Sequence, residues 1–133
     1  MFDHVVISVS DYAASKAFFE QALAPLGVEV VAENQLGVEF CRPDGVSSFC
    51  IRLEPVTNHP LLHLAFTAES RQQVHAFHRA ALAAGGRDIG APGLRPEYHA
   101  NYYGAFVIGP DGHNIEGVHP RFHGHLREGR LRP

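Results

Sequence analysis

Hydrophobic and polar residues follow each other along the first part of the chain in a pattern that predicts a strand, a helix and three further strands. The run from His4 to Val9 is rich in β-branched residues, and Ser10-Asp11 supplies side chains that begin helices. Apolar residues then recur at helical spacing as far as Leu26, and Gly27 stands where a helix is expected to end. Three short β-rich segments follow, at residues 28–32, 37–41 and 48–53.

The same pattern restarts after a polar linker at residues 54–60. A shift of 59 residues places His4 on His63 and Phe18 on Phe77, with no gap across the strand and the helix. A final hairpin, residues 105–118, turns at Pro110-Asp111-Gly112. The repeat predicts two β-α-β-β-β modules of the α+β class within one domain, residues 1–133. Module one covers residues 1–54, module two residues 61–120, and a C-terminal extension residues 121–133.

Module two has a longer connection between its helix and its final hairpin. The two Pro-Asp-Gly turns match at an offset of 67 instead of 59, so eight more residues lie in this part, within residues 90–103. A loop that is longer than the topology requires and carries aromatic and polar side chains is typical of substrate contact. The alternative is that its aromatic residues only pack the loop down. The candidate substrate contacts are Arg95, Tyr98 and Tyr102, with His99 as a possible acid or base.

Composition and charge narrow the possible partners. The 133 residues are 45% hydrophobic and 19% charged, as is usual for a globular protein, and the formal charge is −3. This charge argues against nucleic acid or an anionic membrane as the main partner. No apolar run is long enough to span a membrane, and no basic leader is present, so we expect a cytoplasmic protein with two free thiols.

Three side chains form a candidate metal site. His4 and His63 begin the equivalent first strands of the two modules, and Glu116 lies on the last strand of module two. Two imidazoles and a carboxylate can hold a divalent ion and leave coordination positions open; they suit zinc, iron, manganese and nickel alike. The alternatives are half-exposed histidines and a structural ion pair of Glu116. At the turn offset of 67, Phe49 stands in module one where Glu116 stands in module two.

The paired modules, their opening histidines and the stretch YYGAFVIGPDGHNIEG, residues 102–117, resemble the vicinal oxygen chelate superfamily. The resemblance covers about residues 1–120. This group includes glyoxalase I, extradiol dioxygenases, fosfomycin-resistance proteins and bleomycin-binding proteins. The resemblance implies a curved mixed sheet around a metal-binding cavity, with His4, His63 and Glu116 as ligands. It also implies a metal that acts as a Lewis acid on a substrate chelated through two adjacent oxygens.

The branch of the superfamily stays open. Glyoxalase I has a carboxylate in module one where Phe49 stands, and extradiol dioxygenases usually have a tyrosine at Phe106. The potassium-binding loop of fosfomycin-resistance proteins has no clear counterpart, and bleomycin-binding proteins lack the metal ligands. Phe49 joins Arg95, Tyr98 and Tyr102 as a predicted substrate contact.

The sequence thus predicts a metal-dependent enzyme of the glyoxalase or dioxygenase type, a lyase, isomerase or dioxygenase, acting on a small oxygen-rich metabolite. His99 and Glu116 are the predicted catalytic residues. The alternative is a non-catalytic protein that binds a small molecule in the same cavity, for sequestration or resistance. A homodimer is expected. Its modules either pair within one chain or are exchanged, in which case His4 joins His63 and Glu116 of the other chain.

Overall fold

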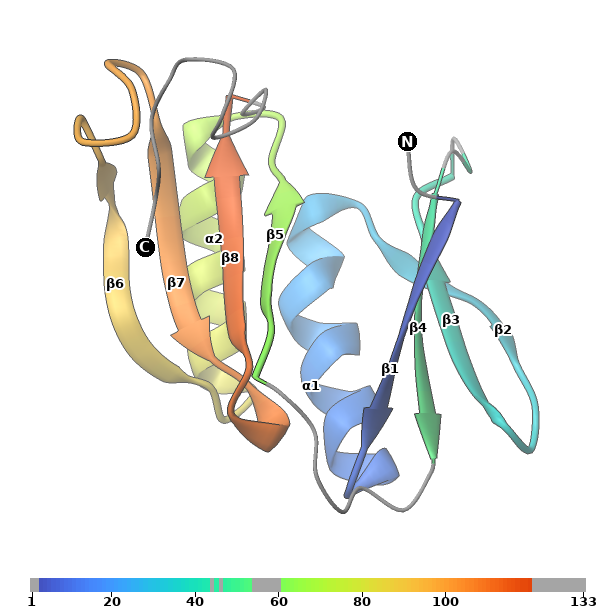
Figure 1. Cartoon of the computed structure of the whole chain (residues 1–133). Helices are drawn as coiled ribbons and strands as arrows, with labels where there is room; N and C mark the ends of the chain where they lie inside the picture. Colours follow the sequence, from blue (N-terminus) through green and yellow to red (C-terminus); the bar gives the residue numbers. More distant parts are fainter. Residues whose placement is uncertain (1–2, 44, 46, 54–60, 121–133) are drawn as a thin grey trace.

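The chain forms two modules with the same order of elements, which confirms the predicted β-α-β-β-β repeat (Figure 1). Residues 3–43, 45, 47–53 and 61–120 are described in this computed structural model. Module one contains β1 (His4–Val9), α1 (Tyr12–Leu23), β2 (Glu29–Glu33), β3 (Gly37–Cys41) and β4 (Ser48–Leu53). Module two contains β5 (His63–Thr67), α2 (Arg71–Ala83), β6 (Arg87–Leu94), β7 (Tyr103–Ile108) and β8 (Asn114–His119). The predicted linker, residues 54–60, the predicted extension, residues 121–133, and Asp44 of the first turn lie outside the described residues.

Each module has its own mixed four-stranded sheet. The strand order is β1-β4-β3-β2 in module one and β5-β8-β7-β6 in module two. The pairs β1–β4 and β5–β8 are parallel and the other pairs are antiparallel. The predicted mixed pairing of strands is confirmed, but the expected single curved sheet is not seen in one chain. Its described strands form two separate sheets, with β1 and β5 at their edges.

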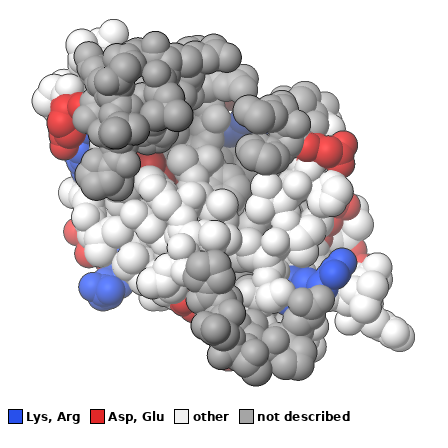
Figure 2. Space-filling view, viewed as in Figure 1, with Lys and Arg blue, Asp and Glu red and all other residues white. Residues whose placement is uncertain are grey.

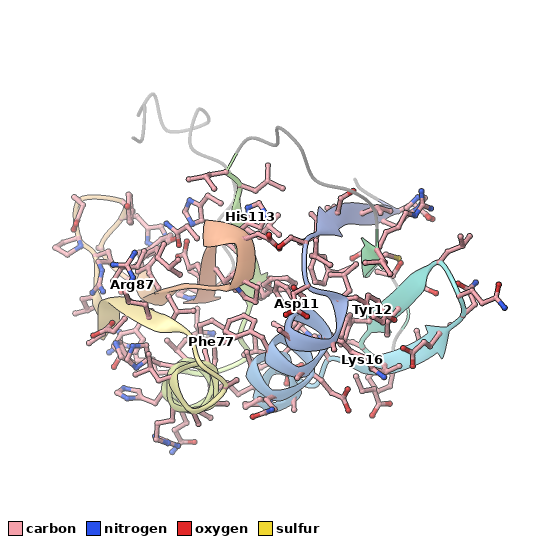
Figure 3. All side chains as sticks on the ribbon, turned by 90° about the horizontal axis from the view of Figure 1, so that it is seen from below. Asp11, Tyr12, Lys16, Phe77, Arg87 and His113 are labelled. Atoms are coloured by element: carbon pink, nitrogen blue, oxygen red, sulfur yellow. The ribbon has the colours of Figure 1, made fainter. Side chains whose placement is uncertain are left out.

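The two helices begin in the same way. The Asp11 carboxylate accepts a hydrogen bond from the Ala14 amide at 3.0 Å, and the Ser70 hydroxyl accepts one from the Gln73 amide at 3.1 Å. Each cap satisfies an amide that has no partner inside the helix. Figure 3 labels Asp11 at the start of α1. The predicted helix to Leu26 is α-helical only as far as Leu23 and continues as a 3-10 turn, Ala24–Leu26, which contains a proline.

The two helices pack against each other, and Figure 1 shows α1 between the sheets of the two modules and α2 behind β7 and β8. Phe18 of α1 and Phe77 of α2, which match in the repeat, are both fully buried. The Phe18 ring reaches into module two, where a Cβ atom at Gly86 or Gly109 would lie 3.0 Å from it. Phe77 packs on β8 in the same close manner, against Gly117. One hydrophobic core therefore runs through both modules.

Polar contacts also tie the modules together. The Ser10 hydroxyl donates to the Asp111 carboxylate at 2.6 Å. The Arg42 guanidinium donates to the carbonyl of Leu26 at 3.0 Å and to the carbonyl of Thr67. These bonds fix the position of module two relative to the end of β1 and the end of β3.

Charged side chains are scattered where they can be seen. Figure 2 shows Lys and Arg side chains spread over the visible face of the molecule, without a single large basic patch among the described residues of that face. No helix in the described part of the chain is long and apolar enough to cross a membrane.

Candidate functional site

Each sheet packs one face against the helices, and no described helix or strand covers the other face. In β1 and β4 the buried residues Ile7 and Ile51 face the helices, so their neighbours point the opposite way. We call the second side the open face of its module. The open face of module one carries His4, Val6, Glu39, Cys50 and Arg52. The open face of module two carries His63, Ala65, Phe106, Glu116 and Val118.

Glu116 is a buried carboxylate at the centre of the second open face. It is 1% exposed, and its Oε1 atom lies 2.8 Å from Nε2 of His63, whose side chain is 45% exposed. Its Oε2 atom accepts a hydrogen bond from the Tyr102 hydroxyl. A buried carboxylate is tolerated when such partners compensate its charge. Two of the three predicted metal ligands, His63 and Glu116, are thus neighbours within one chain.

Tyr102 is held as a hydrogen-bond donor. Burial, followed by the hydrogen bond to Glu116, holds the pKa of the Tyr102 hydroxyl above its ordinary value, so the hydroxyl keeps its proton at neutral pH. Gly104 provides the space for this contact, since a Cβ atom there would lie 3.1 Å from Oε2 of Glu116 and 3.3 Å from the Tyr102 ring. Tyr102 therefore contacts a predicted metal ligand directly.

The long connection of module two folds over this carboxylate. Strand β6 extends to Leu94, so the loop itself comprises residues 95–102. Its two ends are joined by a hydrogen bond of 2.7 Å from the Arg95 amide to the Tyr102 carbonyl. The rings of Tyr98 and His99 pack on the Tyr102 ring, with centroids 4.7 Å and 5.3 Å away. The Arg95 guanidinium lies over the Phe106 ring at 5.4 Å. The four loop residues chosen from the sequence thus gather beside Glu116.

His4 lies on the other open face. Its side chain is 57% exposed, and its Nδ1 atom is 2.7 Å from the Asp3 carboxylate. Within the residues that the structure describes, no group of three His, Cys, Asp or Glu side chains is placed to hold a metal ion. One chain therefore presents His63 and Glu116 as two donors, a nitrogen and an oxygen that suit a divalent ion, and His4 belongs to a different sheet.

A groove of about 290 Å³ crosses the open face of module one. It is lined by His4, Glu39, Cys50 and Arg52 among others. Burial, and then the charge of Glu39, raise the pKa of the Cys50 thiol, so it is protonated at neutral pH. Sequence reasoning did not select Cys50 for this face. Cys50 stands between Phe49 and Ile51, two residues typical of a hydrophobic core. In a strand, this alternation predicts that Cys50 points to the opposite face.

The match of Phe49 with Glu116 is wrong. Glu116 pairs with Phe106 across β7 and with Ala65 across β5, and Cys50 holds the equivalent position in module one, opposite Glu39 and Val6. The connection between the hairpin strands is residues 42–47 in module one but only 109–113 in module two. The offset that aligns the two Pro-Asp-Gly turns is therefore one residue too large for β4 and β8. A shift of one residue exchanges the two faces of a strand.

Phe49 consequently lies on the helix side of its sheet. It is 6% exposed, and its ring packs at 4.9 Å from Phe19 and 5.5 Å from Phe66. A side chain in this position joins the cores of the two modules. Phe49 is therefore left out of the proposed substrate contacts on the open face.

The sequence matches the model of the family described as Glyoxalase/Bleomycin resistance protein/Dioxygenase superfamily over residues 1–116. The chain belongs to this superfamily. A glyoxalase/bleomycin resistance protein from Albidiferax ferrireducens is similar to it at 30% identity and a TM-score of 0.78, covering 90% of this chain and 99% of the other.

Two more distant superfamily structures share the fold. One is a glyoxalase/bleomycin resistance protein/dioxygenase family enzyme from Burkholderia phytofirmans, with 20% identity and a TM-score of 0.67 over 87% of this chain and 95% of the other. The second is lactoylglutathione lyase from Agrobacterium tumefaciens, with 17% identity and a TM-score of 0.64 over 89% and 92%. No curated protein matches the chain significantly. The superfamily contains lyases and dioxygenases, and its members often bind divalent metals.

Proposed function

We propose that this protein is a metal-dependent enzyme of the glyoxalase and dioxygenase type that acts on a small oxygen-rich metabolite. His63 and Glu116 of one chain and His4 of a second copy hold the divalent ion. The observation that carries this proposal is the 2.8 Å approach of His63 Nε2 to Glu116 Oε1 on an open sheet face. An imidazole nitrogen and a carboxylate oxygen so close together are both donors that suit a divalent ion.

The donor set determines the chemistry. Zinc, iron, manganese and nickel all accept two imidazoles and one carboxylate, and when bound the ion supplies Lewis-acid assistance to two adjacent oxygens of a substrate. Glu116 would offset part of the charge of the ion, and its Oε1 atom lies beside the Nε2 atom of His63, so that the two donors are close together. His99 is the proposed proton carrier. Arg95, Tyr98 and Tyr102 are the proposed substrate contacts, beside the apolar surface of Phe106 and Val118.

A second copy is needed because the two open faces belong to separate sheets. His4 and Val6 at the edge of one sheet, and His63 and Ala65 at the edge of the other, are all exposed. In a homodimer with exchanged modules, β1 of one copy lies beside β5 of the other, so each His4 meets the His63–Glu116 pair of its partner. The two open faces then enclose one site, and the exposed edges are covered.

A mixing experiment tests the shared site. His4→Ala and His63→Ala proteins, purified without a histidine tag because the chain has ten histidines of its own, are each expected to lose metal binding. Co-expression of the two variants produces mixed dimers. In an exchanged dimer, one of the two sites then has both histidines intact, so metal binding returns in part. The readout is metal content per chain after dialysis, measured by mass spectrometry.

The metal content of the mixed dimers distinguishes a site built from two chains from a site built from one chain. Restored metal in the mixed dimer supports a site built from two chains. Two variants that each lack metal and show no restoration would mean that all ligands come from one chain. Wild-type protein that binds no divalent ion would contradict the metal-dependent function altogether.

Sequestration of a small ligand is the second candidate. It is favoured by the hydrophobic cluster of Tyr98, Tyr102, Phe106 and Val118, which lies apart from the main core. In that case the protein binds an aromatic or apolar compound with the same affinity before and after treatment with a chelator. Loss of ligand binding on metal removal would favour the enzyme.

A further inference from the structure

The two oxygens of the Glu116 carboxylate have different partners. Oε1 lies 2.8 Å from His63 Nε2, and Oε2 accepts the hydrogen bond from Tyr102. Glu116 is almost fully buried and Tyr102 is 4% exposed, so water cannot easily replace Tyr102 as the partner of Oε2. Only Oε1 is directed to the side on which the proposed ion would be held by His63.

Tyr102 is fixed from several directions. Its carbonyl accepts from the Arg95 amide at 2.7 Å, and its amide donates to the His99 carbonyl at 3.2 Å. The ring packs against Tyr98 and His99 and belongs to the apolar cluster with Phe106 and Val118. A side chain held at both backbone groups and at its ring loses little further freedom when it donates to a carboxylate, so the hydroxyl is preorganised.

The backbone next to the carboxylate is shaped for the same contact. At Gly104 a Cβ atom would lie within 3.1 Å of Glu116 Oε2 and 3.3 Å of the Tyr102 ring, so a larger residue would push both groups away. The described residues of module one hold no carboxylate in this way. Its corresponding connection between β2 and β3 is residues 34–36, and Cys50 takes the place of the carboxylate.

We infer that Tyr102 is a positioning residue that holds Oε2 of Glu116 away from the metal, so that the carboxylate binds a divalent ion through Oε1 alone. This inference rests on the proposed function, since it concerns the same metal. A one-oxygen carboxylate leaves one more coordination position for the substrate. It also disfavours calcium, which readily takes both oxygens of a carboxylate and requires six to eight ligands in total.

The test uses Tyr102→Phe, which keeps the ring and removes only the hydroxyl. Tyr103→Phe is the matched control, because the neighbouring Tyr103 hydroxyl lies on the helix side of the sheet, 2.5 Å from His75 Nε2. Full-length, untagged proteins are loaded with cobalt(II), whose visible absorption weakens as the coordination number increases. The same samples are titrated with calcium to measure its competition with cobalt.

We expect Tyr102→Phe to bind cobalt with weaker visible absorption and to lose about 10-fold of its preference for cobalt over calcium, as is usual when an outer partner of a ligand is removed. Tyr103→Phe should behave as wild type. Gly104→Ala displaces the same contact and should shift both readings in the same direction, which keeps the test valid if Tyr102→Phe folds poorly. Thermal unfolding of each variant checks the fold.

Two results would overturn the inference. If wild type binds cobalt, and Tyr102→Phe and Gly104→Ala keep the wild-type spectrum and cobalt preference, the hydroxyl does not position the carboxylate, and the proposed function is untouched. If wild type binds no cobalt, the proposed function fails and the inference fails with it.

Discussion

The open faces of the two modules have the same strand register and different chemistry. Module two places the buried Glu116 where module one places Cys50, and Phe106 where module one places Glu39. The carboxylate of module two is surrounded by His63, Tyr102 and an apolar cluster, whereas the face of module one is a half-open groove with charged residues. One scaffold can thus carry a preorganised carboxylate on one copy and a more polar, open surface on the other. Function on this fold depends on what the equivalent positions carry.

The hydrophobic cores of the two modules also differ at one position that matches in the repeat. Phe19 of module one packs against Phe40 and Phe49, and the residue that matches it in module two is His78. His78 is buried and its Nε2 atom is 3.1 Å from the Asp88 carboxylate on β6. Where module one has these aromatic contacts, module two has a polar bond between its helix and its long edge strand.

The largest effect is expected from the matched core residues Phe18 and Phe77. Changing either to alanine removes a fully buried ring and should lower the free energy of unfolding by about 3–5 kcal/mol. Since Phe18 reaches Gly86 and Gly109 of the other module, its loss should also reduce the cooperativity of unfolding. Urea denaturation followed by far-UV circular dichroism measures both quantities. A cooperativity of unfolding in Phe18→Ala equal to that of wild type would mean that Phe18 does not couple the modules.

Glu116→Gln and Glu39→Gln make the same change on the two open faces. Glu116→Gln should weaken divalent metal binding at least about 100-fold, or about 2.8 kcal/mol, because it removes a proposed ligand. Glu39→Gln should leave metal affinity unchanged. Isothermal titration calorimetry provides both affinities. Equal losses in the two variants would mean that Glu116 is not a metal ligand that differs from other carboxylates on the open faces.

The helix caps should have equal and smaller effects. Asp11→Ala and Ser70→Ala each remove an acceptor for an amide in the first helical turn, at a cost of about 1 kcal/mol. The two caps match in the repeat, so their losses should agree. Denaturant midpoints measure the change, and a clear difference between them would indicate that one helix start is also held by tertiary contacts.

Asp88 should make module two sensitive to acid. The hydrogen bond from His78, and then the Gly90 amide, lower the pKa of the Asp88 carboxyl below its ordinary value. A lowered pKa in the folded state contributes stability above the ordinary pKa, and this stability is lost as the pH falls through the lowered value. Asp88→Asn should therefore be less stable than wild type at neutral pH and approach it below the folded pKa. Parallel profiles of unfolding free energy against pH for the two proteins would contradict this role.

Sequence reasoning predicted the repeat well because the signals are local. The matches of His4 with His63 and of Phe18 with Phe77 depend on helix and strand periodicity, which the side-chain order alone determines. The error at Phe49 shows the limit. The offset of one Pro-Asp-Gly turn was carried into the following strand, although the two hairpin connections differ by one residue, and strand faces alternate with every residue.

The long loop of module two was recognised from its length and composition, but its main contact was not. The hydrogen bond from Tyr102 to Glu116 joins residues fourteen positions apart and requires the loop to fold back over the sheet. The preferences of neighbouring residues for helix, strand or turn do not indicate that the loop folds back over the sheet. The relation of His4 to the His63–Glu116 pair is equally beyond local patterns, since these residues lie in different sheets.

The order of residues by itself determined the two modules, their helix caps and the candidate donors, because each of these follows from periodicity and side-chain type over a few turns or strands. Tertiary structure alone decided that the modules form two sheets, that Cys50 and not Phe49 is the counterpart of Glu116, and that Tyr102 holds one oxygen of that carboxylate. The physical reason is that these outcomes depend on strand register and on contacts between distant segments, where a single residue of slip or a folded loop changes which side chains meet.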